Sequence, residues 1–137
     1  MILHLSTASR NARSTALINQ LDANASPGYI EVYTAPQPGT GGAAITTQVK
    51  LGTCVLSKPS GTVNNSQLTF DIIADDVAAD TNGQIAWARF YDGAGVWVMD
   101  GDCGDQASNA LIKFNTVDVL EGGLIAFISG VLTEGNS

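Results

Sequence analysis

Residues 84–101, with the sequence QIAWARFYDGAGVWVMDG, carry the clearest structural signal in this chain. Both halves are rich in aromatic and β-branched side chains, and residues 92–95 between them combine an aspartate with two glycines. This pattern is a strong signal for a β-hairpin. Pairing of Tyr91 with Val96 would close the turn. We therefore predict two antiparallel strands, one on each side of residues 92–95.

The predicted pairing divides the hairpin into two faces. One face is apolar and is expected to be core, whereas the other mixes aromatic and charged side chains, a composition typical of an interface. A shift of one residue in the register would exchange the pairings. The first face holds Phe90 opposite Trp97 and Ala88 opposite Met99, and the second holds Arg89 opposite Val98, Trp87 opposite Asp100, and Tyr91.

The period of two continues on both sides of the hairpin, in short runs separated by Gly, Pro, Asn and Asp. No long helical pattern alternates with these runs, which argues against a parallel α/β sheet. Seven or eight strands and one early helix predict an all-β fold, an antiparallel β-sandwich or jelly roll with a short N-terminal α-helix. The further strands are expected at 29–34, 48–57, 67–73, 110–115 and 123–132.

Two further segments, residues 35–42 and 123–132, have distinctive compositions. Residues 35–42, with two prolines and three glycines, are expected to form an exposed loop. This loop is not a phosphate-binding loop, because Ala43 stands where that motif requires lysine. Residues 123–132 are apolar on both faces of the expected strand. Either this strand is interior and covered on both sides, or one face meets another subunit.

The N-terminal region is predicted to be helical. Ser6 or Thr7 can cap a helix that begins near Ala8, and turn residues from Asn24 onward end it. We expect one domain over residues 1–137, in which 1–27 form an arm and helix and 28–137 form the β-sandwich. The expected apolar stripe of the helix consists of Ala8, Ala12, Ala16, Leu17, Ile18 and Leu21.

Charge is divided unevenly along the chain. Residues 1–21 contain Arg10, Arg13 and His4 without any carboxylate, whereas the rest contains 13 acidic and four basic side chains. The formal net charge of −7 disfavours nucleic acid and acidic lipid as partners. Arg10 and Arg13 share one face of the helix. Either they are hydrated and balance the acidic field, or they dock on carboxylates of a partner.

Features of membrane insertion and of secretion are weak. No apolar run approaches the roughly 20 residues that span a bilayer, and Met1 to Leu5 does not resemble a signal peptide. We expect a soluble protein synthesised in the cytoplasm, without a membrane partner. Cys54 and Cys103 are expected to be free thiols that fill small spaces, with a disulfide as the alternative.

Residues suited to catalysis are scarce. His4 is the sole histidine, so a catalytic triad or a multi-histidine metal site would depend on an N-terminal residue. Asp75, Asp76 and Asp80 suggest the paired carboxylates of glycoside hydrolysis, but their flanking residues are typical of a loop. We therefore expect no catalytic residue, no cofactor and no small-molecule substrate.

One acidic turn is the best candidate for a metal site. Asp100, Asp102 and Asp105 could surround a hard cation such as calcium. An EF-hand loop beginning at Asp100 would nevertheless place Asp105 where glycine is required and Leu111 where the bidentate glutamate belongs. A solvated acidic turn without metal is the expected outcome.

Three stretches resemble a known family. They are residues 5–12 (LSTASRNA), 28–38 (GYIEVYTAPQP) and 87–95 (WARFYDGAG). Together they resemble small structural proteins of tailed-phage virions, in particular the jelly-roll cement, or decoration, proteins of capsids such as that of a Bordetella phage. The resemblance implies a β-sandwich that self-associates and clamps neighbouring major capsid subunits on the outside of an icosahedral shell.

These observations lead to one expectation and one alternative. We expect a structural, non-enzymatic protein on the capsid exterior, synthesised in the host cytoplasm, with the major capsid protein and a second copy in a homodimer as its partners. The alternative is a tail- or fibre-associated protein that binds carbohydrate through Trp87, Tyr91 or Trp97. The candidate partner-binding residues are Arg10, Arg13, Trp87, Arg89 and Tyr91.

Overall fold

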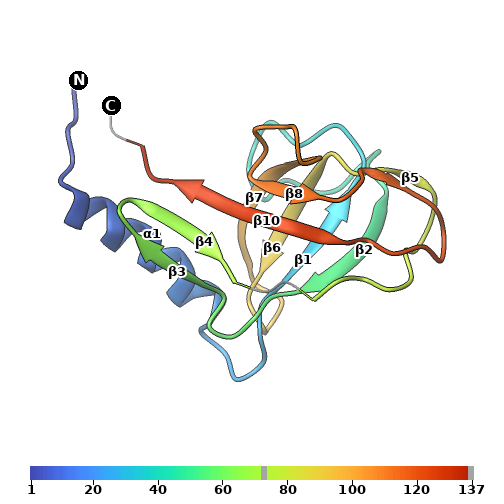
Figure 1. Ribbon diagram of the computed structural model, residues 1–137, viewed down its shortest axis with the longest axis horizontal. Coiled ribbons are helices and arrows are strands. Elements are labelled where there is room, and N and C mark those ends of the chain that lie inside the picture. Colours follow the sequence, from blue (N-terminus) through green and yellow to red (C-terminus); the bar gives the residue numbers. More distant parts are fainter. Residues whose placement is uncertain (72–73, 136–137) are drawn as a thin grey trace.

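The computed structural model describes residues 1–71 and 74–135, and it is mostly β (Figure 1). One helix, α1, covers Thr7–Leu21. The strands are β1 (Tyr29–Tyr33), β2 (Lys50–Val55), β3 (Gly61–Asn64), β4 (Gln67–Phe70), β5 (Gly83–Gln84), β6 (Trp87–Tyr91), β7 (Trp97–Gly104), β8 (Ile112–Phe114), β9 (Asp118–Val119) and β10 (Phe127–Thr133).

Eight strands form one curled sheet in the order β2-β1-β6-β7-β8-β10-β4-β3, and β5 pairs with β9. The described ladders are antiparallel except for the pairing of β7 with β8, which is parallel. In Figure 1, β10 crosses in front of β1 and β6, and the core fills the space between the two halves of the sheet. Phe70 from β4 and Phe90 from β6 meet there, with ring centroids 5.3 Å apart. The predicted all-β fold with an N-terminal helix is confirmed.

The predicted hairpin is present as β6 and β7, but its predicted register is wrong. Tyr91 pairs with Trp97 rather than with Val96, and Arg89 pairs with Asp100. The cause is Asp92, whose carboxylate accepts hydrogen bonds from the backbone amides of Ala94 and Val96, both at 2.9 Å. These bonds hold Val96 within the turn. The pairing shifts between Phe90 and Tyr91, where Val98 of β7 is the extra residue of a bulge.

The helix begins where the sequence predicts. Ser6 is its N-cap, and the Ser6 hydroxyl accepts a hydrogen bond from the amide of Ser9 at 3.1 Å. The buried face is partly different from the expected stripe. Leu21 is buried, but Ser14 is buried as well, whereas the three alanines of the stripe are exposed.

Polar contacts explain why the helix turns this face inward. Helix α1 packs on the hairpin of β3 and β4, beside which it runs in Figure 1. The Asn11 side chain accepts a hydrogen bond from the amide of Ser66 at 2.7 Å, and Asp22 accepts from the amide of Ser60 at 3.0 and 3.1 Å. The helix is therefore fixed by capping the backbone of the hairpin as well as by apolar burial.

Strand β10 lies between β8 and β4, and its two faces differ. Phe127 turns toward the core and makes an edge contact with Phe114, with ring centroids 6.5 Å apart. Ile128 and Val131 are exposed at 46% and 39%. An interior strand covered on both sides is therefore the wrong interpretation of residues 123–132.

Both cysteines are free thiols, as expected. Burial raises the pKa of Cys54 to about 11 and raises the pKa of Cys103 as well. Such thiols are poor nucleophiles at neutral pH. Within residues 1–71 and 74–135, no helix is long and apolar enough to cross a membrane.

Candidate functional site

Two of the three carboxylates that suggested glycoside hydrolysis accept hydrogen bonds from backbone amides, and the third, Asp80, is exposed. Asp76 accepts hydrogen bonds from the amides of Thr53 at 2.9 Å and Ala78 at 3.0 Å. Asp75 accepts from the amide of Phe127 at 2.9 Å. These side chains tie the loop after β4 to β2 and β10. Their geometry satisfies orphan amides, which is a structural role.

The carboxylates of Asp102, near the end of β7, and of Asp105, just after it, also accept hydrogen bonds from backbone amides. Asp102 accepts a hydrogen bond from the amide of Leu111 at 2.9 Å, and Asp105 accepts from the amide of Ala107 at 3.0 Å. Among the residues that the structure describes, no group of three or more His, Cys, Asp and Glu side chains is placed to hold a metal ion.

Asp100 instead forms the centre of a buried polar network. Arg89 donates to both of its oxygens, at 2.8 and 2.9 Å. The indole of Trp97 and the amide of Gly42 donate to it as well, each at 3.0 Å. Burial alone would raise the pKa of Asp100, but the hydrogen bonds from Arg89, Gly42 and Trp97 outweigh it and lower this pKa. The network anchors the loop after β1 to the sheet.

Two of the candidate partner-binding residues belong to this buried layer. The side chain of Trp87 is fully buried, and its indole donates to the carbonyl of Thr34 at 3.0 Å. Arg89 is 5% exposed, and its guanidinium lies over the Trp87 ring, 5.2 Å from the centroid. The prediction that both residues face a partner is therefore corrected, because the folded chain itself covers them.

The aromatic rings proposed for carbohydrate binding are also engaged within the chain. Trp87 stacks on Tyr33 with centroids 4.8 Å apart, and Tyr91 stacks on Tyr29 at 5.1 Å. Trp97 is 44% exposed, but a side chain at Gly42 would meet its ring at 3.1 Å, so the loop lies against it. A sugar ring needs an open aromatic face. Tyr91 is half-buried, and one face of its ring is covered by Tyr29.

Arg10 and Arg13 have a partner inside the chain. Arg13 forms an ion pair with the Glu134 carboxylate at 3.0 Å, and Arg10 donates to the Glu134 carbonyl at 3.4 Å. The two arginines thus connect α1 to the segment that follows β10. Neither alternative drawn from the sequence, simple hydration or docking on another protein, describes this contact.

Among the described residues, the four most exposed large apolar side chains, Met1, Ile2, Val77 and Leu120, lie in two places. The first is the segment before α1, which we call the apolar arm, residues 1–4. Met1 and Ile2 are almost entirely exposed, and Leu3 is 41% exposed. Figure 1 shows this segment projecting beyond the helix. The rest of the chain covers little of the apolar surface of this arm, so most of that surface is exposed to water.

The second place is the distal patch, formed by Val77, Leu120 and Leu124. These side chains are exposed at 77%, 73% and 56%. Two loops meet there, because the amide of Ile125 donates to the carbonyl of Asp76 and the amide of Ala79 donates to the carbonyl of Gly123, both at 2.8 Å.

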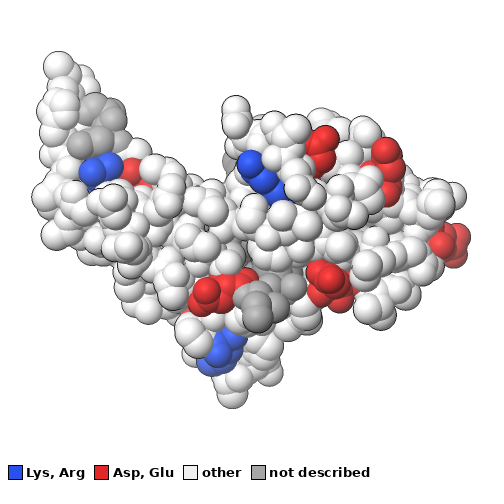
Figure 2. Space-filling view, viewed as in Figure 1, with Lys and Arg blue, Asp and Glu red and all other residues white. Residues whose placement is uncertain are grey.

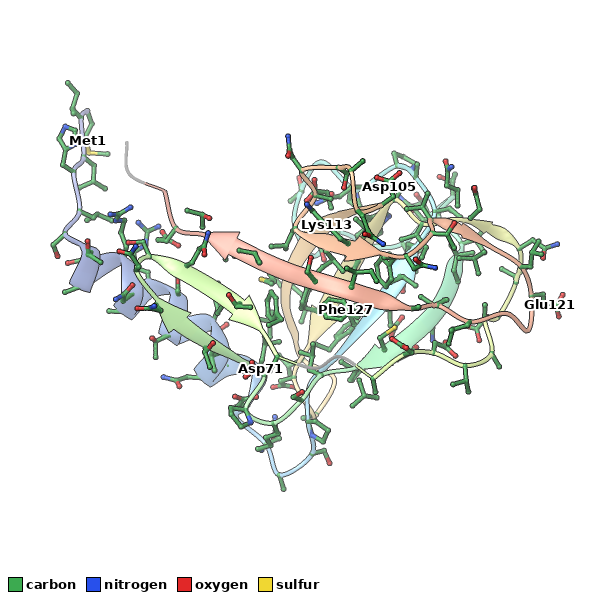
Figure 3. The ribbon with its side chains drawn as sticks, viewed as in Figure 1. Met1, Asp71, Asp105, Lys113, Glu121 and Phe127 are labelled. Carbon is green, nitrogen blue, oxygen red and sulfur yellow. The ribbon has the colours of Figure 1, made fainter. Side chains whose placement is uncertain are left out.

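Exposed acidic side chains lie close in sequence to the residues of the distal patch. Asp80, Asp118 and Glu121 come from the same two loops and from β9, and all three are exposed. Figure 3 labels Glu121 at one end of the long axis and Met1 at the other. The apolar arm and the distal patch therefore lie at opposite ends of the molecule.

The sequence held a signal for the distal patch that periodicity did not detect. Segments 75–80 and 118–124 contain turn residues, yet each also carries large aliphatic side chains, namely Val77, Leu120 and Leu124. A large aliphatic residue in a turn has no strand face on which to be buried. Its presence there is the available indication of an exposed apolar surface.

A shallow hollow beside β8 and β10 is the remaining candidate. It has a volume of about 210 Å³, small against the several hundred Å³ of typical ligand pockets. Figure 2 shows a hollowed outline between the projecting N-terminal part and the body of the molecule. The hollow is open to solvent and does not enclose a substrate. It is lined by Asn109, Ala110, Leu111, Lys113, Ser129 and Val131.

Comparisons of the chain with protein-family models, with curated proteins and with solved structures gave no match.

Proposed function

We propose that this chain is a structural virion protein, a cement protein that binds the outside of a tailed-phage capsid and stabilises contacts between neighbouring subunits of the shell. The single observation that carries the proposal is the placement of two exposed apolar surfaces at opposite ends of one small β-sandwich. The proposal also takes up the expectation drawn from residues 5–12, 28–38 and 87–95, whose resemblance to capsid cement proteins stays a prediction.

Two separated contact surfaces suit a protein that bridges neighbours. One molecule that contacts two proteins of a lattice gains from the second contact without paying again for its lost translational freedom. Because it binds the assembled shell and not the separated subunits, its binding energy stabilises the shell through linkage. Weak contacts repeated by the symmetry of the shell are sufficient for this role.

The remaining chemistry of the chain supports a binding role over a catalytic one. Asp75, Asp76 and Asp102 each accept hydrogen bonds from backbone amides, which is a structural use of a carboxylate. Carbohydrate binding at a tail or fibre is disfavoured by the stacking of Trp87 on Tyr33 and of Tyr91 on Tyr29. We therefore retain capsid decoration as the one proposed function.

The proposal is tested by mixing the purified protein with undecorated shells and measuring co-sedimentation. Wild type is expected to pellet with the shells, and both Ile2→Asp and Leu124→Asp are expected to bind at least tenfold less tightly. Gln106→Asp, which adds the same charge at an exposed turn between the two ends, is the matched control. Wild-type protein that stays in the supernatant would refute capsid decoration.

A further inference from the structure

We propose that the hollow beside β8 and β10 is a binding site for a carboxylate on a short aliphatic stem, supplied by a glutamate side chain of a partner protein. The hollow is lined by residues 109–111, Lys113, Ser129 and Val131. This inference goes beyond the proposed function, because none of these residues belongs to the apolar arm or to the distal patch.

Two neighbouring strands present the polar side chains of the hollow on the outer face of the sheet. Along β8, Ile112 and Phe114 are buried, so the alternation of a strand turns Lys113 outward between them. Strand β10 lies beside β8, and Ser129 is the register partner of Lys113. The Cβ atoms of such a cross-strand pair are about 5 Å apart. An ammonium-bearing side chain and a hydroxyl therefore stand next to each other on paired backbone.

The polar side chains of the hollow have no partner within residues 1–71 and 74–135. The ion pairs found there use other cations, so the Lys113 ammonium lacks a carboxylate partner. The side chains of Ser129 and Asn109 make no hydrogen bond to the described residues either. A hollow on which a few unpaired polar groups converge is the usual form of a small ligand site.

The lining of the hollow is positive, although the chain as a whole is acidic. Lys113 is the one charged residue among the lining residues, and Figure 3 labels it beside β8 and β10. Strand β7 places Gly104, which has no side chain, opposite Lys113. The carboxylate of Asp102 on the same strand accepts the Leu111 amide at 2.9 Å. Repulsion from exposed acidic side chains elsewhere is screened over about 8 Å at physiological ionic strength.

The lining also indicates the class of ligand. The side chains of Lys113, Ser129 and Asn109 can all donate hydrogen bonds, which suits an anion rich in acceptors. The remaining lining, residues 110–111 and Val131, is apolar and can cover methylene groups, which a carboxylate side chain has and a phosphate ion lacks.

The size of the hollow restricts the ligand further. Its volume of about 210 Å³ lies below the roughly 300 Å³ at which typical ligand pockets begin. The hollow therefore accommodates the end of one side chain and not a whole cofactor. Because it is open to solvent, a free small carboxylate binds weakly, whereas a side chain on a docked partner is held there by the contacts around it.

An NMR titration of the full chain at physiological ionic strength tests the class of ligand. The probe is sodium butyrate, which carries the carboxylate and methylene groups of a glutamate side chain. Butyramide has the stem without the charge, and inorganic phosphate has the charge without the stem. We expect saturable shifts of the backbone amides of residues 109–113 and 129–131 with butyrate, and at least fivefold lower affinity for the other two. No saturable shift with butyrate, or equal affinity for butyramide or phosphate, would overturn the carboxylate site.

A pair of lysine variants tests the role of the ammonium group. Lys113→Gln is expected to bind butyrate at least fivefold less tightly than wild type. Lys58→Gln removes the same charge at an exposed position outside the hollow and is the matched control, with unchanged affinity. The amide spectrum of each variant reports whether its fold is intact. Equal affinity of folded Lys113→Gln and wild type would show that the hollow is not a carboxylate site.

Two capped tripeptides test whether a protein side chain is the source of the carboxylate. Acetyl-Ala-Glu-Ala-amide is expected to bind at the same amides at least as tightly as butyrate, and the peptide with glutamine in place of glutamate at least fivefold less tightly. If butyrate binds and the glutamate peptide does not, the hollow is a site for small anions and the assignment to a partner protein is wrong. Co-sedimentation with shells is a separate measurement, so this inference and the proposed function can fail independently.

Discussion

Arg89 and Asp100 lie opposite each other on β6 and β7 and form a two-pronged ion pair, with N–O distances of 2.8 and 2.9 Å. Their side chains are only 6% and 3% exposed. Since the indole of Trp97 and the amide of Gly42 share the same carboxylate, this pair fixes the loop after β1 on the outer face of the sheet.

Removal of the charge on Asp100 is expected to destabilise the fold strongly. In Asp100→Asn, the buried guanidinium of Arg89 loses its counter-charge, and breaking one side of a buried pair costs about 3–5 kcal/mol. Urea unfolding measures the change in the free energy of unfolding. Asp105→Asn, in an exposed turn, is the control and should change stability by less than about 0.5 kcal/mol. Equal stability of the two variants would contradict the importance of the network.

The same network predicts a dependence of stability on pH. The pKa of Asp100 is lower in the folded chain than its ordinary value of 3.8, so the unfolded state binds a proton more readily. The contribution of this group is therefore fully present above about pH 5 and is lost as the pH falls through 3.8 and below. Thermal unfolding between pH 7 and pH 3 should show a smaller loss for Asp100→Asn than for wild type. Equal losses of thermal stability in wild type and Asp100→Asn would contradict the predicted direction of the pH dependence.

Gly42 is expected to tolerate no side chain. Its φ is +73°, and a Cβ there would lie 3.1 Å from the Trp97 ring. Gly42→Ala should therefore cost about 1–2 kcal/mol and shift the tryptophan fluorescence as Trp97 moves. Gly39→Ala, in the same loop but with nothing within 4 Å, is the matched control and should leave both unchanged. Identical spectra for the two variants would show that the loop does not pack on Trp97.

The arginines of α1 are expected to secure the end of β10. Replacement of Arg10 and Arg13 by glutamate repels Glu134, whose amide donates to the carbonyl of Ser66 at 2.8 Å. Arg13 is 57% exposed, so the loss of global stability should stay near or below about 1 kcal/mol. Hydrogen exchange at the Glu134 amide should accelerate more than tenfold, whereas Lys58→Glu should leave it unchanged. If hydrogen exchange at the Glu134 amide is unchanged in the double variant, Arg10 and Arg13 do not secure the end of β10.

The sequence predicted elements more reliably than it predicted pairings. The Ser6 cap and the alternating runs specify α1 and most strands locally, through propensity and turn chemistry. The register of β6 and β7 was not predictable, because it depends on the Asp92 carboxylate holding Val96 inside the turn. Strand β3 was missed because its sequence, Gly61–Asn64, is too polar and short to show a clear pattern.

Burial was the second property that local pattern could not supply. Trp87 and Arg89 alternate with core residues, which is typical of an outer face, yet the loop after β1 covers them. Conversely, Leu120 and Leu124 are apolar and remain exposed, because the loop that carries both is hydrogen-bonded to residues 76–79 while their side chains stay uncovered. Both outcomes arise from contacts between segments far apart in the sequence. The alternation of apolar and polar residues along a strand carries no information about such contacts.

Imaging of shells decorated with this protein tests capsid cementing most directly. A reconstruction is expected to show the molecule on the outer surface, with density of a neighbouring protein against both the apolar arm and the distal patch. Molecules that are absent from the shell, or that attach while both ends remain in solvent, would contradict the account.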